Sequence, residues 1–135
     1  MKNTRELITD IRHMISPENL ESEEYKQIDH VAYIKQLMEE HAVKPKDLII
    51  SLNVERSYLY QILKGRRAPG RDFLLRFARL LQLNLEETQR LLKIAQRQPL
   101  YPRNKRDAAI IYAITHKLKL EEFDNFMESL EKEYE

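Results

Sequence analysis

The chain has 135 residues, 42% of them hydrophobic, which is enough for one compact core with an extension. With two glycines and no cysteine, it is unsuited to Gly-rich phosphate loops, disulfides, thiolate chemistry and zinc-finger sites. The first residues contain no apolar segment typical of a signal peptide, and no run approaches the ~18 apolar residues of a membrane span. We therefore expect a soluble, cytoplasmic protein.

The formal net charge of +1 conceals a strong pattern along the chain. Residues 1–43 carry five Lys or Arg against nine Asp or Glu, and residues 107–135 carry three against eight. Residues 44–106 carry fifteen against five. A partner responds to this local excess rather than to the total, because salt screens fields beyond about 8–10 Å. Charged helix faces that are simply solvated are the alternative explanation.

Two helices are expected before the basic segment. The first spans residues 3–15, with Asn3 as its cap and Glu6 three residues later. Pro17 ends it, and an acidic segment leads into a long helix from about residue 22 to 41. The positions expected to face inward on that second helix are Ile28, Val31, Ile34, Leu37 and Met38.

The basic segment opens with a short helix and a tight turn. Pro45 suits the first helical position, and Asp47 lies in the first turn. The apolar stripe of this helix consists of Leu48, Ile49 and Leu52. Asn53 tolerates the left-handed backbone that a tight turn between helices requires. Val54 can then fill the angle between the two helices.

A second helix follows over about residues 56–64, with Glu55 as its cap. The spacing i, i+3, i+4 places Leu59, Ile62 and Leu63 on its inward face. The opposite face carries Arg56, Ser57, Tyr60, Gln61 and Lys64. Arg, Ser, Gln and Lys are side chains that contact base edges in a DNA major groove. This helix is therefore a candidate recognition helix.

A loop that is rich in basic residues and helix breakers comes next. Gly65 is expected to end the candidate recognition helix in a left-handed cap, and Gly70 to cap a helix over residues 71–81. Basic side chains beside a recognition helix are placed to contact phosphates. The candidate phosphate contacts are Lys44, Lys46, Lys64, Arg66, Arg67 and Arg71. Ordinary surface charge is the alternative for each of them.

The remaining chain predicts three more helices. Asn84 and Glu87 form a capping box that starts the first, and Asn104 with Asp107 caps the second. The last helix spans about residues 120–134. Its apolar stripe consists of Phe123, Phe126, Met127 and Leu130. Two explanations of this stripe remain, which are packing onto the same domain and self-association of two chains.

Residues 48–87 resemble the XRE-type family of helix-turn-helix proteins, to which Cro and the phage repressors belong. The matching sequence is LIISLNVERSYLYQILKGRRAPGRDFLLRFARLLQLNLEE. Asn53 stands where the family most often has Gly, and Ile49 where it usually has Ala. Tyr58 and Tyr60 are bulkier than the usual small polar residues. The resemblance implies an all-α, lambda-repressor-like bundle, here with additional N- and C-terminal helices.

The resemblance also implies a sequence-specific transcriptional regulator that places the helix at about 56–64 in the major groove of double-stranded DNA. The candidate base contacts are Arg56, Ser57, Tyr60 and Gln61. Arg matches guanine O6 and N7, and Gln matches adenine N6 and N7, whereas Tyr58 lies to the side, where packing is expected. Such proteins usually bind two half-sites as dimers, so the resemblance adds a homodimer through the terminal helices as the alternative to packing within one chain. We divide the chain into an N-terminal extension (1–25), the DNA-binding domain (26–97) and a C-terminal extension (98–135).

Catalysis and protein interaction are the two alternative functional classes. Catalysis is not favoured, because adjacent acids such as Glu86 and Glu87 point in different directions, which suits capping rather than an acid–base pair. The four histidines lack metal-ligand spacing and the serines lack a nucleophile elbow, so neither a metal nor a cofactor is predicted. The rival hypothesis is a protein-interaction adaptor with a helix-turn-helix fold that does not read DNA. The two tyrosines on the exposed helix support this hypothesis, because aromatic residues are enriched at protein interfaces.

Overall fold

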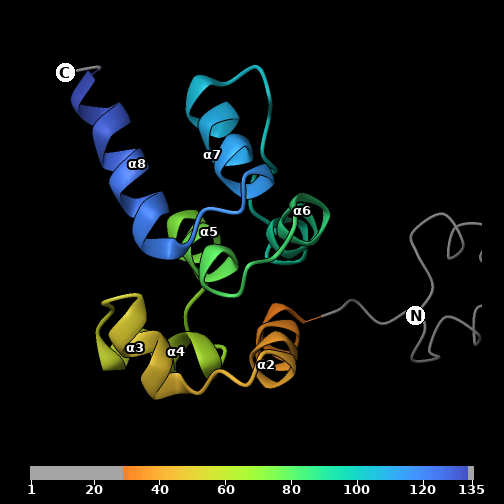
Figure 1. Cartoon of the computed structure of the whole chain (residues 1–135). Coiled ribbons are helices and arrows are strands. Elements are labelled where there is room, and N and C mark those ends of the chain that lie inside the picture. The colour runs from red at the N-terminus through yellow and green to blue at the C-terminus, as the bar shows by residue number, and fades with distance from the viewer. Residues whose placement is uncertain (1–28, 134–135) are drawn as a thin grey trace, which may run out of the picture.

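The structure, a computed structural model, describes residues 29–133. In this range the chain forms seven α-helices and no strand (Figure 1), so the predicted all-α class is confirmed. The helices are α2 (His30–Glu40), α3 (Pro45–Ser51), α4 (Arg56–Leu63), α5 (Arg71–Leu80), α6 (Leu85–Ile94), α7 (Lys105–Thr115) and α8 (Leu120–Glu133). The helix expected over residues 3–15 lies outside the described residues. Between residues 29 and 133, none of the helices combines the length and the apolar character that crossing a membrane requires.

The helices form three tiers (Figure 1). At one end α4 contacts α2 and α3, and at the other end α7 contacts α8. Between these tiers lie α5 and α6, which contact each other, and α5 also contacts α8. Within α5, Leu74, Phe77 and Ala78 are completely buried. A single hydrophobic core therefore runs from the first tier to the last, with α5 at its centre.

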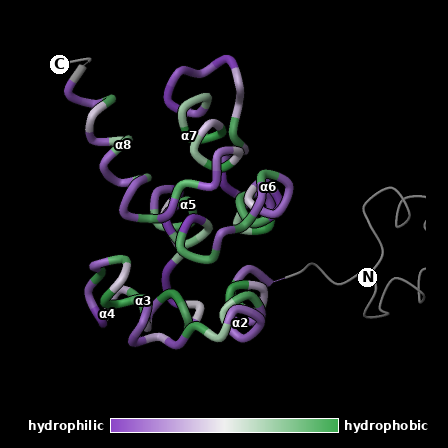
Figure 2. The backbone as a smooth tube through the Cα atoms, viewed as in Figure 1, coloured by the Kyte–Doolittle hydropathy of each residue, from purple (hydrophilic) through white to green (hydrophobic). Residues whose placement is uncertain are grey.

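Amphipathic sequence explains how the helices pack around the shared core. Each outer helix alternates between hydrophilic and hydrophobic residues (Figure 2). On α8 the predicted stripe is divided, because Phe123 and Met127 are buried while Phe126 and Leu130 are partly buried against the core. Burial of the first two supports the simpler explanation of this stripe, which is packing within the same chain.

Several predicted helix starts are confirmed by their capping bonds. The Glu87 N–H donates to Asn84 Oδ1 at 2.8 Å, and the Asn84 N–H donates to Glu87 Oε1 at 3.0 Å, as a capping box requires. Asn104 caps α7 by accepting from the Asp107 N–H at 3.0 Å. The expected start of α2 at about residue 22 is wrong. The helix begins at His30, because Asp29 is in extended backbone and its side chain accepts from the Val31 N–H at 2.9 Å.

Most of the helices end in a left-handed residue, and most of those residues are not glycine. Gly65 has φ +76° and Asn53 has φ +50°, as the sequence predicts. Four further positions share this conformation without a residue type that requires it, and these are Ala42, Gln82, Gln96 and Lys117. Each of the four is followed by a residue whose N–H reaches back into the last helical turn, for example Leu83 N–H to the Ala78 carbonyl at 3.0 Å. These bonds satisfy carbonyls that a helix end would otherwise leave free.

Candidate nucleic-acid interface

Helix α4 has one buried and one exposed face, as the sequence predicts. Leu59 and Ile62 are completely buried, and Leu63 is 7% exposed. On the opposite face Arg56, Ser57, Gln61 and Lys64 are exposed, and Tyr60 is partly buried. Lys64 itself is the C-cap, one residue beyond the helix. Contacts with α2 and α3 hold the buried face, so the polar face is presented outward on a rigid support.

The turn between α3 and α4 is stabilised from outside as well as by its own residues. Asn53 supplies the positive φ, and Val54 packs against the core. Arg76 of α5 donates from Nη1 to the Leu52 carbonyl oxygen at 2.6 Å, at the C-terminal cap of α3. Glu55 is the N-cap of α4 but makes no capping bond through its side chain. The angle between α3 and α4 therefore depends partly on a side chain from α5.

The basic loop after α4 is folded back onto the helix. Gly65 donates its N–H to the Ile62 carbonyl at 3.0 Å, and the N–H groups of Arg66 and Arg67 both donate to the Gln61 carbonyl, at 2.9 and 3.3 Å. The left-handed backbone at Gly65 makes this reversal possible. Both arginine side chains are exposed. The loop thus holds two cations beside the C-terminal end of the polar face.

Two arginines of this surface lie over tyrosine rings of α4. The Arg56 guanidinium carbon is 5.3 Å from the centre of the Tyr60 ring, and that of Arg67 is 4.7 Å from the centre of the Tyr58 ring. Tyr58 packs edge-on against Phe73, as its predicted packing role implies. Arg67, Tyr58, Ser57, Gln61, Val54 and Glu55 line a hollow of about 280 Å³ beside the polar face.

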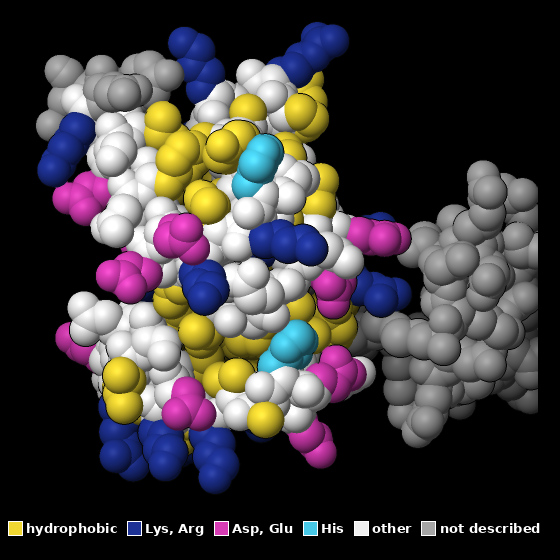
Figure 3. Space-filling model, in the orientation of Figure 1, with side chains coloured by type: hydrophobic (Ala, Val, Ile, Leu, Met, Phe, Trp, Pro, Cys, Tyr) yellow, Lys and Arg dark blue, Asp and Glu magenta, His cyan; other side chains and the backbone are white. Residues whose placement is uncertain are grey.

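Positive charge gathers where the sequence pattern places it. Lys44 and Lys46, at the start of α3, are exposed. The Lys44 N–H is bound by the Asp47 carboxylate at 2.9 Å, which fixes this helix start. In Figure 3, Lys and Arg side chains protrude along the lower edge of the molecule, below the place where Figure 1 shows α3 and α4. The described acidic side chains of α8 are carried on another tier.

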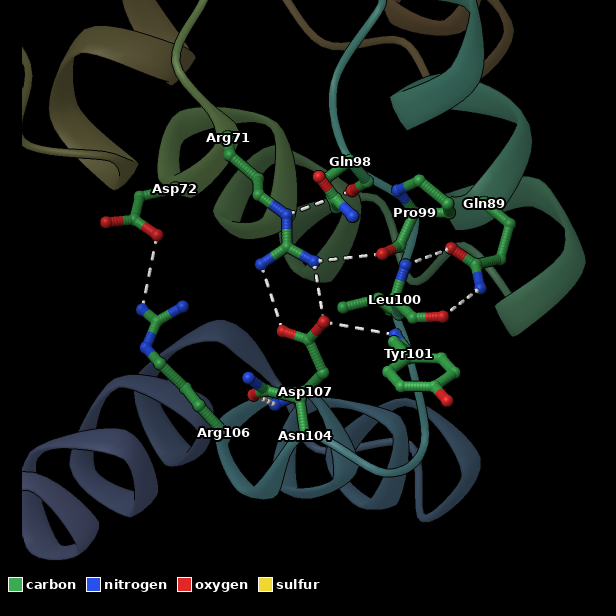
Figure 4. A network of polar contacts seen from close by, with 10 residues as sticks. All are labelled: Arg71, Asp72, Gln89, Gln98, Pro99, Leu100, Tyr101, Asn104, Arg106 and Asp107. Carbon is green, nitrogen blue, oxygen red and sulfur yellow. Dashed lines mark hydrogen bonds and ion pairs between the residues drawn. The ribbon is translucent and has the colours of Figure 1, made fainter.

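Arg71 is occupied by bonds within the protein (Figure 4). Its Nη1 and Nη2 donate to the two carboxylate oxygens of Asp107 at 3.0 and 2.9 Å, and its Nε and Nη2 donate to the carbonyls of Gln98 and Pro99 at 3.0 and 3.3 Å. Asp107 also accepts from the Tyr101 N–H at 3.0 Å. We therefore remove Arg71 from the proposed phosphate contacts, since a phosphate would have to displace this network.

The network also sets the ionisation of Asp107. Burial by itself raises the pKa of this carboxyl, but the bonds from Arg71 and from the Tyr101 N–H outweigh burial and hold the pKa below its usual value. The side chain of Asp107 is 9% exposed and that of Arg71 is 24% exposed. The pair is thus charged and mostly dry. It fixes the start of α5 to the start of α7.

Two more arginines of α5 have structural roles that sequence analysis did not assign. Arg76 forms a two-pronged pair with Asp124 of α8. Arg79 is 2% exposed and donates to the carbonyls of Leu118 and Leu83. Burial lowers the pKa of Arg79. Helical spacing could have predicted the burial of Arg79. This residue follows the buried Leu75 by four positions and so lies on the inward stripe of α5.

Residues 31–91 match the model of a family described as a helix-turn-helix domain. Searches of curated proteins and of solved structures found no match. Across residues 29–133, no three His, Asp or Glu side chains are grouped as a metal site would need. The matched segment contains α3, the turn at Asn53 and α4, so the helix, turn and helix of the structure agree with the description of this family.

Proposed function

We propose that this protein is a sequence-specific DNA-binding transcriptional regulator of the XRE type, which inserts α4 into the major groove. The observation that carries the proposal is the division of α4, whose apolar face is completely buried at Leu59 and Ile62 while the face with Arg56 and Gln61 is exposed. A helix that is held on one side and polar on the other is what groove insertion requires.

The proposed base contacts lie on this exposed face. Arg56 is suited to guanine O6 and N7, and Gln61 to adenine N6 and N7, each with about 1–3 kcal/mol of discrimination against a wrong base. Ser57 lies between them on the same face and can donate to either base or phosphate. Tyr60 lies on the same face and carries Arg56 on its ring.

The proposed phosphate contacts come before and after α4 in the chain. Lys44 and Lys46 belong to the start of α3, while Lys64, Arg66 and Arg67 follow α4, and all five are exposed. A helix-turn-helix domain uses its first helix and its loops on the phosphate backbone, which matches these positions. If all five side chains neutralise phosphates, log K should fall by about 4.5 per tenfold rise in salt, because each contact contributes about 0.9.

The proposal extends to assembly and location. Two copies would read half-sites about 34–36 Å apart. Because Phe123 and Met127 are buried within the chain, a dimer contact on α8 would use the partly buried Phe126 and Leu130. We keep the division into residues 1–25, 26–97 and 98–135, and a cytoplasmic location, as parts of this proposal.

The test is selection of bound sites from a library of random duplex DNA. The wild type should enrich a consensus, and Arg56→Ala should lose preference at one base position while keeping the rest. Lys93→Ala, which removes an exposed charge on α6, is the matched control and should leave the consensus unchanged. A palindromic consensus would support a dimer. If the wild type enriches no sequence, the regulator proposal is abandoned.

One observation favours the adaptor hypothesis as a second candidate. Ile50, Tyr101 and Tyr112 are 77%, 56% and 48% exposed, and Ile50 lies on α3 within the helix-turn-helix. Exposed apolar and aromatic residues are suited to protein interfaces. The two candidates differ in salt dependence, because an apolar interface would not show the steep loss of affinity that phosphate contacts produce.

A further inference from the structure

We propose that the two tyrosines of α4 are positioning residues with separate tasks. Tyr60 holds Arg56 for reading a base, and Tyr58 holds Arg67 for binding a phosphate. This inference rests on the proposed DNA-binding function and assigns the source of specificity within it. Each ring carries one arginine, the Tyr58 ring is anchored to its surroundings, and the two tyrosines lie on different sides of α4.

The pair of Arg56 and Tyr60 lies on the exposed face of α4. The two residues are four apart, so their side chains share one side of the helix, and the guanidinium carbon lies 5.3 Å from the ring centre. None of the ion pairs found among residues 29–133 involves Arg56. The ring of Tyr60, which is itself partly buried, is therefore the contact that restricts an otherwise flexible side chain. Restriction before binding lowers the entropy lost when Arg56 meets a base.

The pair of Arg67 and Tyr58 is anchored more firmly. The Tyr58 ring meets the Phe73 ring edge-on at 5.8 Å and 76°, and its hydroxyl accepts from the Gly70 N–H at 3.4 Å. The Arg67 backbone is fixed as well, through its bond to the Gln61 carbonyl. The guanidinium carbon lies 4.7 Å from the centre of a ring that is itself held by Phe73 and Gly70, and the Arg67 backbone is held by Gln61.

The two rings point to different sides of α4. Residues two apart on an α-helix are about 160° apart around its axis. Tyr60 therefore lies with Arg56 on the polar face, whereas Tyr58 lies at the edge, where Phe73 and the loop meet the helix. An arginine on the polar face of α4 is placed to contact base edges in the groove. An arginine at the border of that face is placed to contact the phosphate backbone beside the groove. Loss of Tyr60 should thus alter base preference, and loss of Tyr58 should weaken binding to all sequences alike.

The free protein provides the first test. In proton NMR spectra, the Arg56 side-chain methylene signals should be shifted upfield by the Tyr60 ring. The shift should persist in Tyr60→Phe, which keeps the ring, and disappear in Tyr60→Leu. If the Arg56 methylene protons had the same chemical shifts in the Tyr60→Phe and Tyr60→Leu variants, the pairing of Arg56 with the Tyr60 ring would be overturned.

DNA binding provides the second test, on the selected consensus and its single-base variants. Tyr60→Leu should reduce discrimination at the Arg56 position about 2- to 5-fold, the effect of one exposed cation–π contact, and Tyr60→Phe should retain it. Tyr58→Leu should reduce affinity for every sequence about 2- to 5-fold with preferences unchanged. Because Tyr58 contacts Phe73, Arg67→Gln serves as the second variant, since it removes the proposed phosphate contact itself without touching the core, and it should lower affinity at least as much with preferences unchanged.

The results distinguish failure of the tyrosine roles from failure of the proposed DNA-binding function. A wild type with clear base preference, together with a Tyr60→Leu variant that keeps the same preference, would overturn the inference and leave the regulator proposal intact. Loss of preference in Tyr60→Phe as large as in Tyr60→Leu would also overturn it, since the hydroxyl rather than the ring would then matter. A wild type without any preference would overturn both.

Discussion

Arg76 of α5 and Asp124 of α8 form a two-pronged ion pair, with Nε–Oδ1 and Nη2–Oδ2 distances of 3.0 and 2.9 Å. The same guanidinium donates from Nη1 to the Leu52 carbonyl at 2.6 Å. One side chain therefore connects the turn of the helix-turn-helix to the last helix of the chain. Because Asp124 holds the Arg76 guanidinium, the position of α8 affects the turn that orients α4.

Asp124→Ala is expected to lower the free energy of unfolding by about 1 kcal/mol, because it removes charge-assisted bonds from a pair that is only partly buried. The exposed fractions of the two side chains are 28% and 40%. Denaturant titration measures the change. Glu128→Ala breaks the exposed i, i+4 pair with Lys132 on the same helix and should cost less than about 0.5 kcal/mol. Equal losses in the two variants would contradict the connecting role of Arg76.

Asp107→Ala should be more damaging, at about 1.5–3 kcal/mol, because it leaves Arg71 with only the carbonyls of Gln98 and Pro99 in a mostly dry site. The comparison variant is Asp72→Ala, whose pair with Arg106 has side chains 75% and 44% exposed. That change should stay within about 0.5 kcal/mol. Thermal or denaturant unfolding of both proteins checks the difference, and a mild loss in Asp107→Ala would show that the network contributes little.

The pH dependence of stability should carry the signature of Asp107. Its pKa is lowered in the folded protein, so its contribution is present above the unfolded-state pKa of about 3.9 and is lost as the pH falls through the folded value. Unfolding free energies measured between neutral pH and about pH 3 should therefore decline more steeply in the wild type than in Asp107→Asn, within the acidic part of that range. Parallel curves would mean that other carboxyls dominate acid unfolding.

The two glycines offer a matched pair for backbone strain. Gly65→Ala should destabilise the protein by about 1–2 kcal/mol, because its φ of +76° disfavours any Cβ, although the space itself is adequate, with Val31 Cγ2 at 3.7 Å. Gly70 has a φ of −73°, and an added Cβ there would lie 3.8 Å from the Tyr58 hydroxyl. Gly70→Ala should cost less, about 0.5 kcal/mol, because its only penalty is the lower preference for alanine at an N-cap. Circular dichroism melting curves compare the two, and similar losses would show that space rather than φ decides the cost.

The sequence by itself determined the elements whose causes lie within a few residues. The caps at Asn84 and Asn104, the left-handed turn at Gly65 and the two faces of α4 follow from residue type and helical spacing, and all are confirmed. Left-handed ends such as Gln82 were not predicted, because nothing in a glutamine requires that conformation. The base and phosphate contacts stay predictions.

Only the tertiary structure decided what the arginines of α5 do. Sequence placed Arg71 next to the basic loop and so suggested a phosphate contact, but its partner Asp107 lies 36 residues away in the chain. Arg76 likewise finds Asp124 at a distance of 48 residues. A guanidinium carries the same charge whether it faces solvent, DNA or a buried carboxylate, and the packing of α7 and α8 on the core determines which of these it meets.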